Sequence, residues 1–252
     1  MILNRTTWET KDIKPFLEYL EEFKQTNKIA WSKNLLNTQM EVLSIPTKTL
    51  FSIVNEIYQG NYLSFLDLDI FSHYESTTIY GKILSRIDDF QLMTKYLKVY
   101  MNHMDCWAHT DILSFRINEA NRLDFIKLAK SLISSNESFK RRLGLFIWLQ
   151  MIKDHRTLEL IYESIHKLQV EDDYYVIMMA GWVLSESIIK YPNEVLLWIQ
   201  SNPTLNAKIV NKAIQKCRES RRLTQTQKDT LLVYKRKVVK HKEKQDSLVH
   251  HK

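Results

Sequence analysis

Signals that start and stop helices recur at short intervals along this chain, and they leave little room for any other kind of element. Between them, apolar residues are spaced three and four apart, as on one face of a helix. In the second half the breaks fall at residues 135–136, 154–155, 171–172, 191–192 and 202–203. Asx and proline residues at these points suit the first turn of a helix. No stretch alternates for long enough to predict a strand, so the sequence predicts an all-α fold.

The predicted helices are short and follow one another closely. With only four glycines and four prolines, the chain is poor in the turns of an all-β fold. Successive two-helix units of about 35–40 residues indicate an α-solenoid of HEAT-like antiparallel helix pairs, with a globular helical bundle as the alternative. The expected helices begin near residue 10 and then cover about 31–37, 46–58, 62–69, 72–86, 90–102, 121–134, 138–152, 155–168, 172–190, 193–201, 205–219 and 225–240.

The positive charge is concentrated at the C-terminal end. Residues 221–252 contain ten Lys and Arg against three acidic residues, which equals the net charge of +7 of the whole chain. Residues 1–220 are left with 26 basic and 26 acidic residues. We therefore expect a helical-repeat domain over residues 1–220 and a basic helix and tail over residues 221–252. Nucleic acid is one partner that fits such a segment, although basic tails often only improve solubility.

Several classes of protein are disfavoured by missing motifs. Cys106 and Cys217 are far apart, which favours free thiols in a reducing compartment. Neither a signal peptide nor a membrane-spanning apolar run is recognisable, so we expect a cytoplasmic protein with no membrane contact. Glycine-rich phosphate loops, HExxH and GxSxG are missing, and the histidines do not cluster. We expect no metal site and no cofactor.

Three segments remain that could carry chemistry. The first includes Trp107 and Asp111, which would lie one turn apart on one helix face. The second includes Arg141 and Arg142, and the third is Ala180-Gly181-Trp182-Val183-Leu184-Ser185-Glu186. Each has a plain structural interpretation, because a tryptophan usually packs, an aspartate often caps a helix and an arginine pair is often solvated. Trp8, Trp31, Trp148 and Trp198 are assigned to packing.

The order and spacing of these segments resemble the AlkD-type DNA glycosylases, the HEAT-like-repeat proteins of DNA alkylation repair. In that family a Trp is followed four residues later by Asp, then by an Arg pair, and then by a string close to A-x-G-W-x-L-R-E. The chain is similar over most of residues 10–220, including the apolar-Pro segment that ends at Pro46. The resemblance implies a solenoid whose concave groove holds duplex DNA.

The resemblance also implies a reaction, the release of positively charged N3- and N7-alkylated purines from duplex DNA. Such a base is a good leaving group, so the remaining task is to stabilise an oxocarbenium-like sugar. Asp111 would supply the anion, and Trp107 and Trp182 would pack on the sugar and add cation–π stabilisation. DNA phosphates would be held by basic side chains, namely Arg142, Arg141, Lys208 and Lys212. The protein would act as a monomer.

Some basic residues of the family pattern are replaced here. Met178 and Ser185 stand where the family often has Lys and Arg around the second Trp, and Asn211 stands near another basic position. Each replacement removes a potential phosphate contact. A catalytically weak HEAT-like protein that binds branched or damaged DNA is therefore the alternative function. A solenoid scaffold for another protein is a third possibility with less support.

Overall fold

The computed structural model describes residues 1–238, and every element in this part of the chain is helical. The predicted α-solenoid is confirmed. Three short 3-10 helices, η1 (Thr10–Asp12), η2 (Thr26–Lys28) and η3 (Leu231–Tyr234), accompany the α-helices. These are α1 (Ile13–Glu21), α2 (Ile29–Leu36), α3 (Thr47–Gln59), α4 (Tyr62–Leu66), α5 (Tyr74–Leu84), α6 (Phe90–Met101), α7 (Trp107–Asp111), α8 (Arg122–Ile133), α9 (Ser138–Met151), α10 (Thr157–Lys167), α11 (Tyr174–Lys190), α12 (Pro192–Ser201), α13 (Ala207–Glu219) and α14 (Gln225–Thr230).

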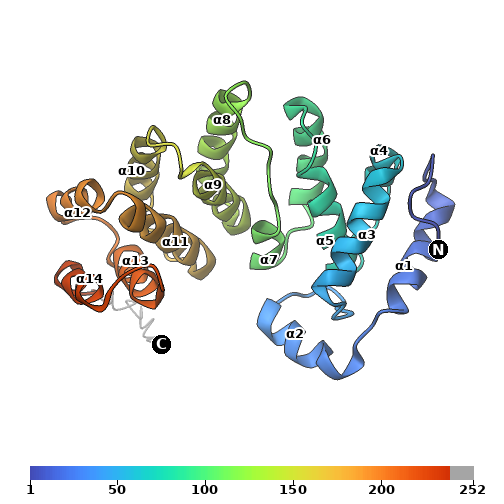
Figure 1. Ribbon diagram of the computed structural model, residues 1–252, viewed down its shortest axis with the longest axis horizontal. Coiled ribbons are helices and arrows are strands. Elements are labelled where there is room, and N and C mark those ends of the chain that lie inside the picture. Colours follow the sequence, from blue (N-terminus) through green and yellow to red (C-terminus); the bar gives the residue numbers. More distant parts are fainter. Residues whose placement is uncertain (239–252) are drawn as a thin grey trace, which may run out of the picture.

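The helices follow an arch in sequence order (Figure 1). α6, α8 and α10 lie on its outer side, whereas α7 and the ends of α9 and α11 lie along its inner side. α9 packs against both α8 and α11, and α11 packs against α13. Each helix therefore buries its apolar face mainly against the next helix or the next but one along the chain, as expected for a solenoid.

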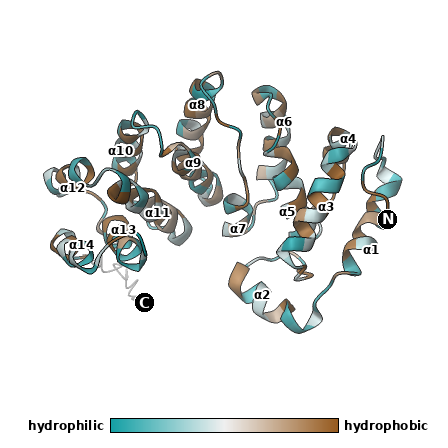
Figure 2. Ribbon diagram, in the orientation of Figure 1, coloured by the Kyte–Doolittle hydropathy of each residue, from teal (hydrophilic) through white to brown (hydrophobic). Residues whose placement is uncertain are grey.

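The main apolar core runs between the two layers of helices, and a second, small cluster is formed by Leu36, Val42, Cys106 and Ala108. The largest fully buried side chains of the main core include Trp148, Tyr80 and Tyr100. Figure 2 shows hydrophobic residues on the facing sides of neighbouring helices and hydrophilic residues along their outer sides. Trp8 is buried as predicted, but Trp31 on α2 is 66% exposed, so its assignment to packing is wrong. In Figure 1, α2 lies at the lower edge of the arch, below α3.

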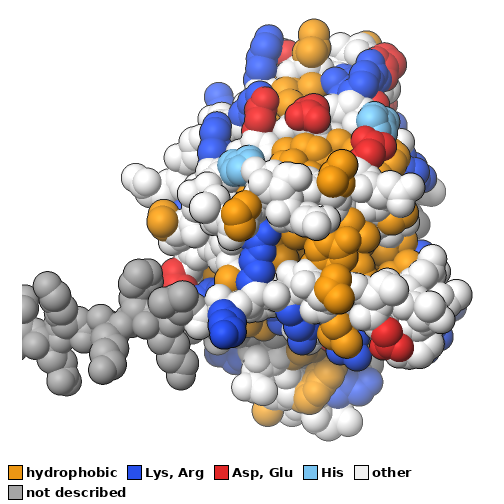
Figure 3. All heavy atoms as spheres, turned by 90° about the vertical axis from the view of Figure 1, so that its left-hand side faces the viewer, with side chains coloured by type: hydrophobic (Ala, Val, Ile, Leu, Met, Phe, Trp, Pro, Cys, Tyr) orange, Lys and Arg blue, Asp and Glu red, His pale blue; other side chains and the backbone are white. Residues whose placement is uncertain are grey.

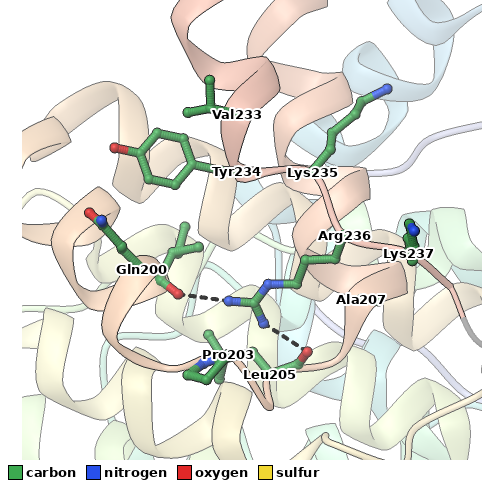
Figure 4. Close-up of a pocket in the computed structure, with 10 residues that line it drawn as sticks. Gln200, Pro203, Leu205, Ala207, Val233, Tyr234, Lys235, Arg236 and Lys237 are labelled. Carbon is green, nitrogen blue, oxygen red and sulfur yellow. Dashed lines mark hydrogen bonds between the residues drawn. The ribbon is translucent and has the colours of Figure 1, made fainter.

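The C-terminal helix is shorter than the predicted 225–240. α14 ends at Thr230, a short 3-10 helix follows, and Lys235 has extended backbone. Long-range bonds favour this path, because the Arg236 guanidinium donates to the carbonyl oxygens of Ile199, Asn202 and Leu205. Figure 4 shows this side chain pointing towards the α12–α13 connection, beside a cavity of about 610 Å³. The rest of the predicted tail, residues 239–252, lies outside the described residues.

The surface at the α12–α14 end is unevenly charged. Figure 3 views this end and shows Lys and Arg side chains both above and below a band of hydrophobic side chains, with most of the Asp and Glu side chains in the upper half. Leu197 and Val233 are among the exposed apolar residues of these elements. Among the described helices, none is long and apolar enough to span a bilayer.

Candidate active site

α7 is a single helical turn that places Trp107 and Asp111 at its two ends. Cys106 precedes it with extended backbone, which sharply redirects the chain into the turn. The Trp107 indole Nε1 donates a hydrogen bond to the carbonyl oxygen of Leu35 on α2, at 3.2 Å. The two residues therefore have the one-turn spacing expected from the sequence, and the tryptophan also ties α7 to the N-terminal end of the arch.

Asp111 is held by Arg142 of α9. Arg142 Nη2 lies 2.8 Å from both carboxylate oxygens, and Nε lies 3.2 Å from Oδ1. Nη1 donates to the carbonyl oxygen of Tyr175 at 2.8 Å. The Arg142 side chain is only 6% exposed, and that of Asp111 is 17% exposed. A buried bidentate pair of this kind is strong and directional, so a phosphate would have to compete with Asp111 for this guanidinium.

Burial and charge act in opposite directions on Asp111. Burial raises the pKa of the Asp111 carboxyl above its usual value, while the positive charges of Arg142 and Lys216 act to lower it. Desolvation disfavours the charged form of an acid, and a nearby cation favours it. Arg142 therefore both orients the carboxylate and opposes the cost of keeping an anion in a partly dry place.

Trp182 and Lys216 approach the same space from the other side. Trp182 lies on α11 and is half-buried, and Lys216 lies on α13. Lys216 Nζ is 5.5 Å from the centre of the Trp182 indole, within the range of a cation–π contact. Lys216 was not among the residues predicted from the sequence. The available signal was its spacing, because Lys208, Lys212 and Lys216 follow one another at intervals of four along one helix face.

These side chains line one cleft of about 440 Å³. It brings together the three predicted catalytic residues with Arg142, Lys216 and Met178. The remaining lining residues come from α2, its C-cap and the first turn of α11, and they are Asn34, Leu35, Asn37, Tyr174 and Tyr175. The cleft therefore offers an anion, two indole faces and a cation within one concave space.

The other predicted phosphate ligands do not line this cleft. Arg141 turns away and pairs with Glu171 at 2.8 Å. Lys208 forms an ion pair with Asp172, and Lys212 Nζ donates to Gln215 Oε1 at 2.9 Å. Adjacent residues on a helix point about 100° apart, which is why Arg142 can face the cleft while Arg141 cannot.

The residues that depart from the family pattern are also placed clearly. Met178 lies in the cleft wall. Ser185 is buried, and its hydroxyl donates to the Trp182 carbonyl oxygen at 2.8 Å. Asn211 is engaged elsewhere, because it exchanges hydrogen bonds with the backbone of Arg236. None of these three positions therefore brings a positive charge to Trp182, which receives one from Lys216.

Cysteine nucleophiles and metal sites were disfavoured from the sequence. Both cysteines are free and buried, and burial raises the pKa of the Cys106 thiol to about 12, which makes it a poor nucleophile in the metal-free protein. Among the described residues, two groups of potential metal ligands lie close together: Glu21, Glu41 and His73, and Asp105, Cys106 and His109.

Comparison with known proteins gives one clear match. The family model described as DNA alkylation repair enzyme matches residues 16–217, which is most of the chain and includes α7, α9, α11 and most of α13. Comparison with curated proteins gives no match.

Proposed function

The chain belongs to the family of DNA alkylation repair enzymes, and we propose that it is a glycosylase that removes positively charged N3- and N7-alkylated purines from duplex DNA. The observation that carries the proposal is the cleft shared by Trp107, Asp111 and Trp182. In this proposal the protein acts as a cytoplasmic monomer, and bond cleavage needs no cofactor.

The chemistry needs little more than an anion and two aromatic faces. As the bond between C1′ and the base nitrogen breaks, its electron pair moves to the base and cancels the positive charge there. The sugar becomes an oxocarbenium-like cation, which a fixed carboxylate stabilises. Asp111 supplies that carboxylate, and the indoles of Trp107 and Trp182 add cation–π stabilisation. Water then attacks C1′, forms the new C1′–O bond and releases one proton to solvent.

Arg142 acts in this proposal as a positioning residue for Asp111. The carboxylate accepts two hydrogen bonds at Oδ1 but only one at Oδ2. An ionised carboxylate has about four acceptor sites, so Oδ2 can still accept a hydrogen bond from the attacking water. A phosphate contact by Arg142 remains a prediction, and it would require part of this pair to open.

In this proposal, the phosphate contacts that hold DNA are made by lysines of α13. Lys216 stands beside Trp182, where Met178 and Ser185 bring no charge. Lys212 and Lys208 lie one and two turns earlier on the same helix, and their partners are the exposed side chains of Gln215 and Asp172. Exposed ion pairs are weak and are readily exchanged for a phosphate.

One observation favours a second function. The guanidinium of Arg142 contacts both oxygens of Asp111, which reduces the negative field available to a sugar cation. A protein that binds damaged or branched DNA through this cleft without releasing the base would be compatible with that pair. The two functions differ in whether free base appears.

The test is release of 7-methylguanine and 3-methyladenine from methylated duplex DNA by the wild type and by Asp111→Asn. We expect the wild type to release base and the variant to lose about 10²–10³-fold in rate, as when one electrostatic stabiliser is removed. DNA affinity should be retained. Asp88→Asn, at an exposed carboxylate outside the cleft, is the matched control. Wild-type release by Asp111→Asn would refute the mechanism, and DNA binding without release by the wild type would establish the second function.

A further inference from the structure

A compact set of metal-ligand atoms lies at the start of α7. Asp105 and Cys106 precede the helix and His109 lies within it. His109 Nδ1 is 3.3 Å from Asp105 Oδ1 and 3.6 Å from Cys106 Sγ, and all three ligand atoms lie within 4.8 Å of one another. Cys106 and His109 are fully buried, and the Asp105 side chain is 27% exposed.

Hydrogen bonding alone does not satisfy this cluster. Nδ1 faces two potential donors, the backbone N–H of Asp105 at 3.4 Å and the Cys106 thiol, and one acceptor, Asp105 Oδ1. A ring nitrogen is either a donor or an acceptor, so one side of this arrangement is always mismatched. Within residues 1–238, Oδ1 is a buried oxygen with no hydrogen-bond partner, although it lies so close to Nδ1.

The second oxygen of Asp105 is fully used. Oδ2 accepts hydrogen bonds from the Thr38 hydroxyl at 2.6 Å and from the backbone N–H groups of Gln39 and Met40 at 2.8 and 3.3 Å. These bonds fix the carboxylate and leave Oδ1 directed at the imidazole and the thiol. The position of the unpartnered oxygen is therefore determined by the fold.

We propose that Asp105, Cys106 and His109 bind a divalent zinc-class metal ion through Oδ1, Sγ and Nδ1. Metal–ligand bonds of about 2.0–2.3 Å in a tetrahedral site place neighbouring ligand atoms roughly 3.3–3.6 Å apart, which matches the two distances measured at Nδ1. A thiolate, a carboxylate and a neutral imidazole balance the charge of a divalent ion. Binding releases the thiol proton to solvent, and a water molecule fills the fourth position.

A cavity reaches one of the three proposed ligands, Asp105. Asp105 lines a separate cavity of about 440 Å³, together with Met101, Met104 and Asn37. The ion would enter from this side. Through Asp105, which is bonded to Thr38, it would link the segment around Thr38 to the single turn of α7. Since that turn carries Trp107 and Asp111, we assign the metal a structural role next to the cleft. The proposal does not depend on glycosylase activity.

The second group of potential ligands makes an instructive contrast. Around Glu21, Glu41 and His73, Lys24 Nζ lies 3.0 Å from one glutamate and 3.6 Å from the other. A positive charge therefore already occupies the place of a metal ion, and the two glutamates are half-buried and exposed. The cluster at α7 contains no such lysine contact and includes sulfur, which favours zinc over harder cations.

The test is titration of the metal-free, full-length protein with cobalt(II), followed by absorption spectroscopy. We expect one equivalent to produce a sulfur-to-cobalt charge-transfer band and tetrahedral d–d bands, both removed by zinc. Cys106→Ser should lose the charge-transfer band, whereas Cys217→Ser, at the other buried cysteine, should retain it. The band also separates this site from histidines such as His250 and His251, which contain no sulfur.

The outcomes are decisive even if one variant folds poorly. Asp105→Asn keeps the side-chain size and should weaken cobalt affinity at least tenfold, because a charged ligand is lost. A wild-type spectrum without the sulfur band, or a band that persists in Cys106→Ser, would overturn the proposal. A metal-free protein that releases alkylated base normally would leave the proposed glycosylase activity intact, so the two proposals can fail separately.

Discussion

The two walls of the cleft are built in different ways. On the α7–α9 wall, Asp111 and Arg142 are bound to each other and nearly buried. On the α11–α13 wall, Trp182 is half-buried and Lys216 reaches over its ring from the neighbouring helix. The first wall holds charge in a fixed geometry, as stabilisation of a transition state requires. The second carries a long, adaptable side chain, as suits a DNA backbone.

Among the substitutions in the two walls, Arg142→Ala should cause the largest loss of stability. The substitution leaves Asp111 without its partner in a partly dry site, and removing one member of a buried ion pair costs about 3–5 kcal/mol of unfolding free energy. Urea denaturation followed by circular dichroism measures the loss. Arg116→Ala is the control, because its ion pair with Asp88 is exposed and should be worth at most about 1 kcal/mol.

A double variant sharpens the same prediction. Asp111→Asn combined with Arg142→Ala leaves no unpaired carboxylate, so it should be more stable than Arg142→Ala alone. If Arg142→Ala loses less than about 1 kcal/mol, the pair is no stronger than a surface salt bridge, and the α7–α9 wall is less rigid than described.

The two walls also differ in how closely their helices approach. A Cβ on Gly144 would lie 2.8 Å from the Ala129 carbonyl oxygen and 2.9 Å from the Ile133 amide nitrogen, both backbone atoms of α8. A Cβ on Gly181 would meet mainly the Lys212 side chain, at 2.5 Å from Cγ and 2.7 Å from Cβ, while the nearest backbone atom is 3.3 Å away. At Gly144 the close contacts include backbone atoms of α8, whereas at Gly181 they are with the base of one side chain, and the backbone lies farther away.

We therefore expect Gly144→Ala to cost about 1–3 kcal/mol of unfolding free energy, as overpacking typically does. Gly181→Ala should cost less, because the gain of about 1 kcal/mol in helix propensity offsets more of the strain. Thermal unfolding of the two variants under identical conditions gives the comparison. If Gly181→Ala lost more unfolding free energy than Gly144→Ala, the α11–α13 wall would be the more rigid of the two.

The sequence predicted the helices well because their signals are local. The ends of α8, Arg122 and Ile133, fall within one residue of the expected 121–134, since apolar spacing is a signal carried by residues close together in the chain. The predicted helix 225–240 was wrong for the opposite reason. Its path beyond Thr230 depends on Arg236 reaching carbonyl oxygens about thirty residues earlier in the chain.

The site was predictable only as a set of candidates. Spacing placed Trp107 and Asp111 one turn apart, but it could not decide which of Arg141 and Arg142 faces Asp111. That choice is fixed by how α9 rotates against α7 and α11. Lys216 was missed for the same reason, because the face of α13 that meets the cleft is set by its packing against α11.

Lys216→Ala should have the smallest effect of the substitutions, and it tests the role of the α11–α13 wall in DNA binding directly. Each phosphate contact contributes about one unit to the slope of log affinity against log salt, so the variant should lower that slope by about one and weaken binding at low salt. Lys127→Ala, at an exposed lysine of α8, should leave the slope unchanged. Fluorescence anisotropy with duplex DNA at several salt concentrations measures both.

Stability should separate Lys216 from Arg142. Lys216 is half-buried beside an indole and has no carboxylate partner in residues 1–238, so its removal should change the unfolding free energy by no more than about 1 kcal/mol, the worth of a partly exposed cation–π contact. A large loss of stability with an unchanged salt slope would mean that Lys216 supports the wall and does not contact DNA. The grip would then have to come from Lys208 and Lys212, whose exposed partners release them readily.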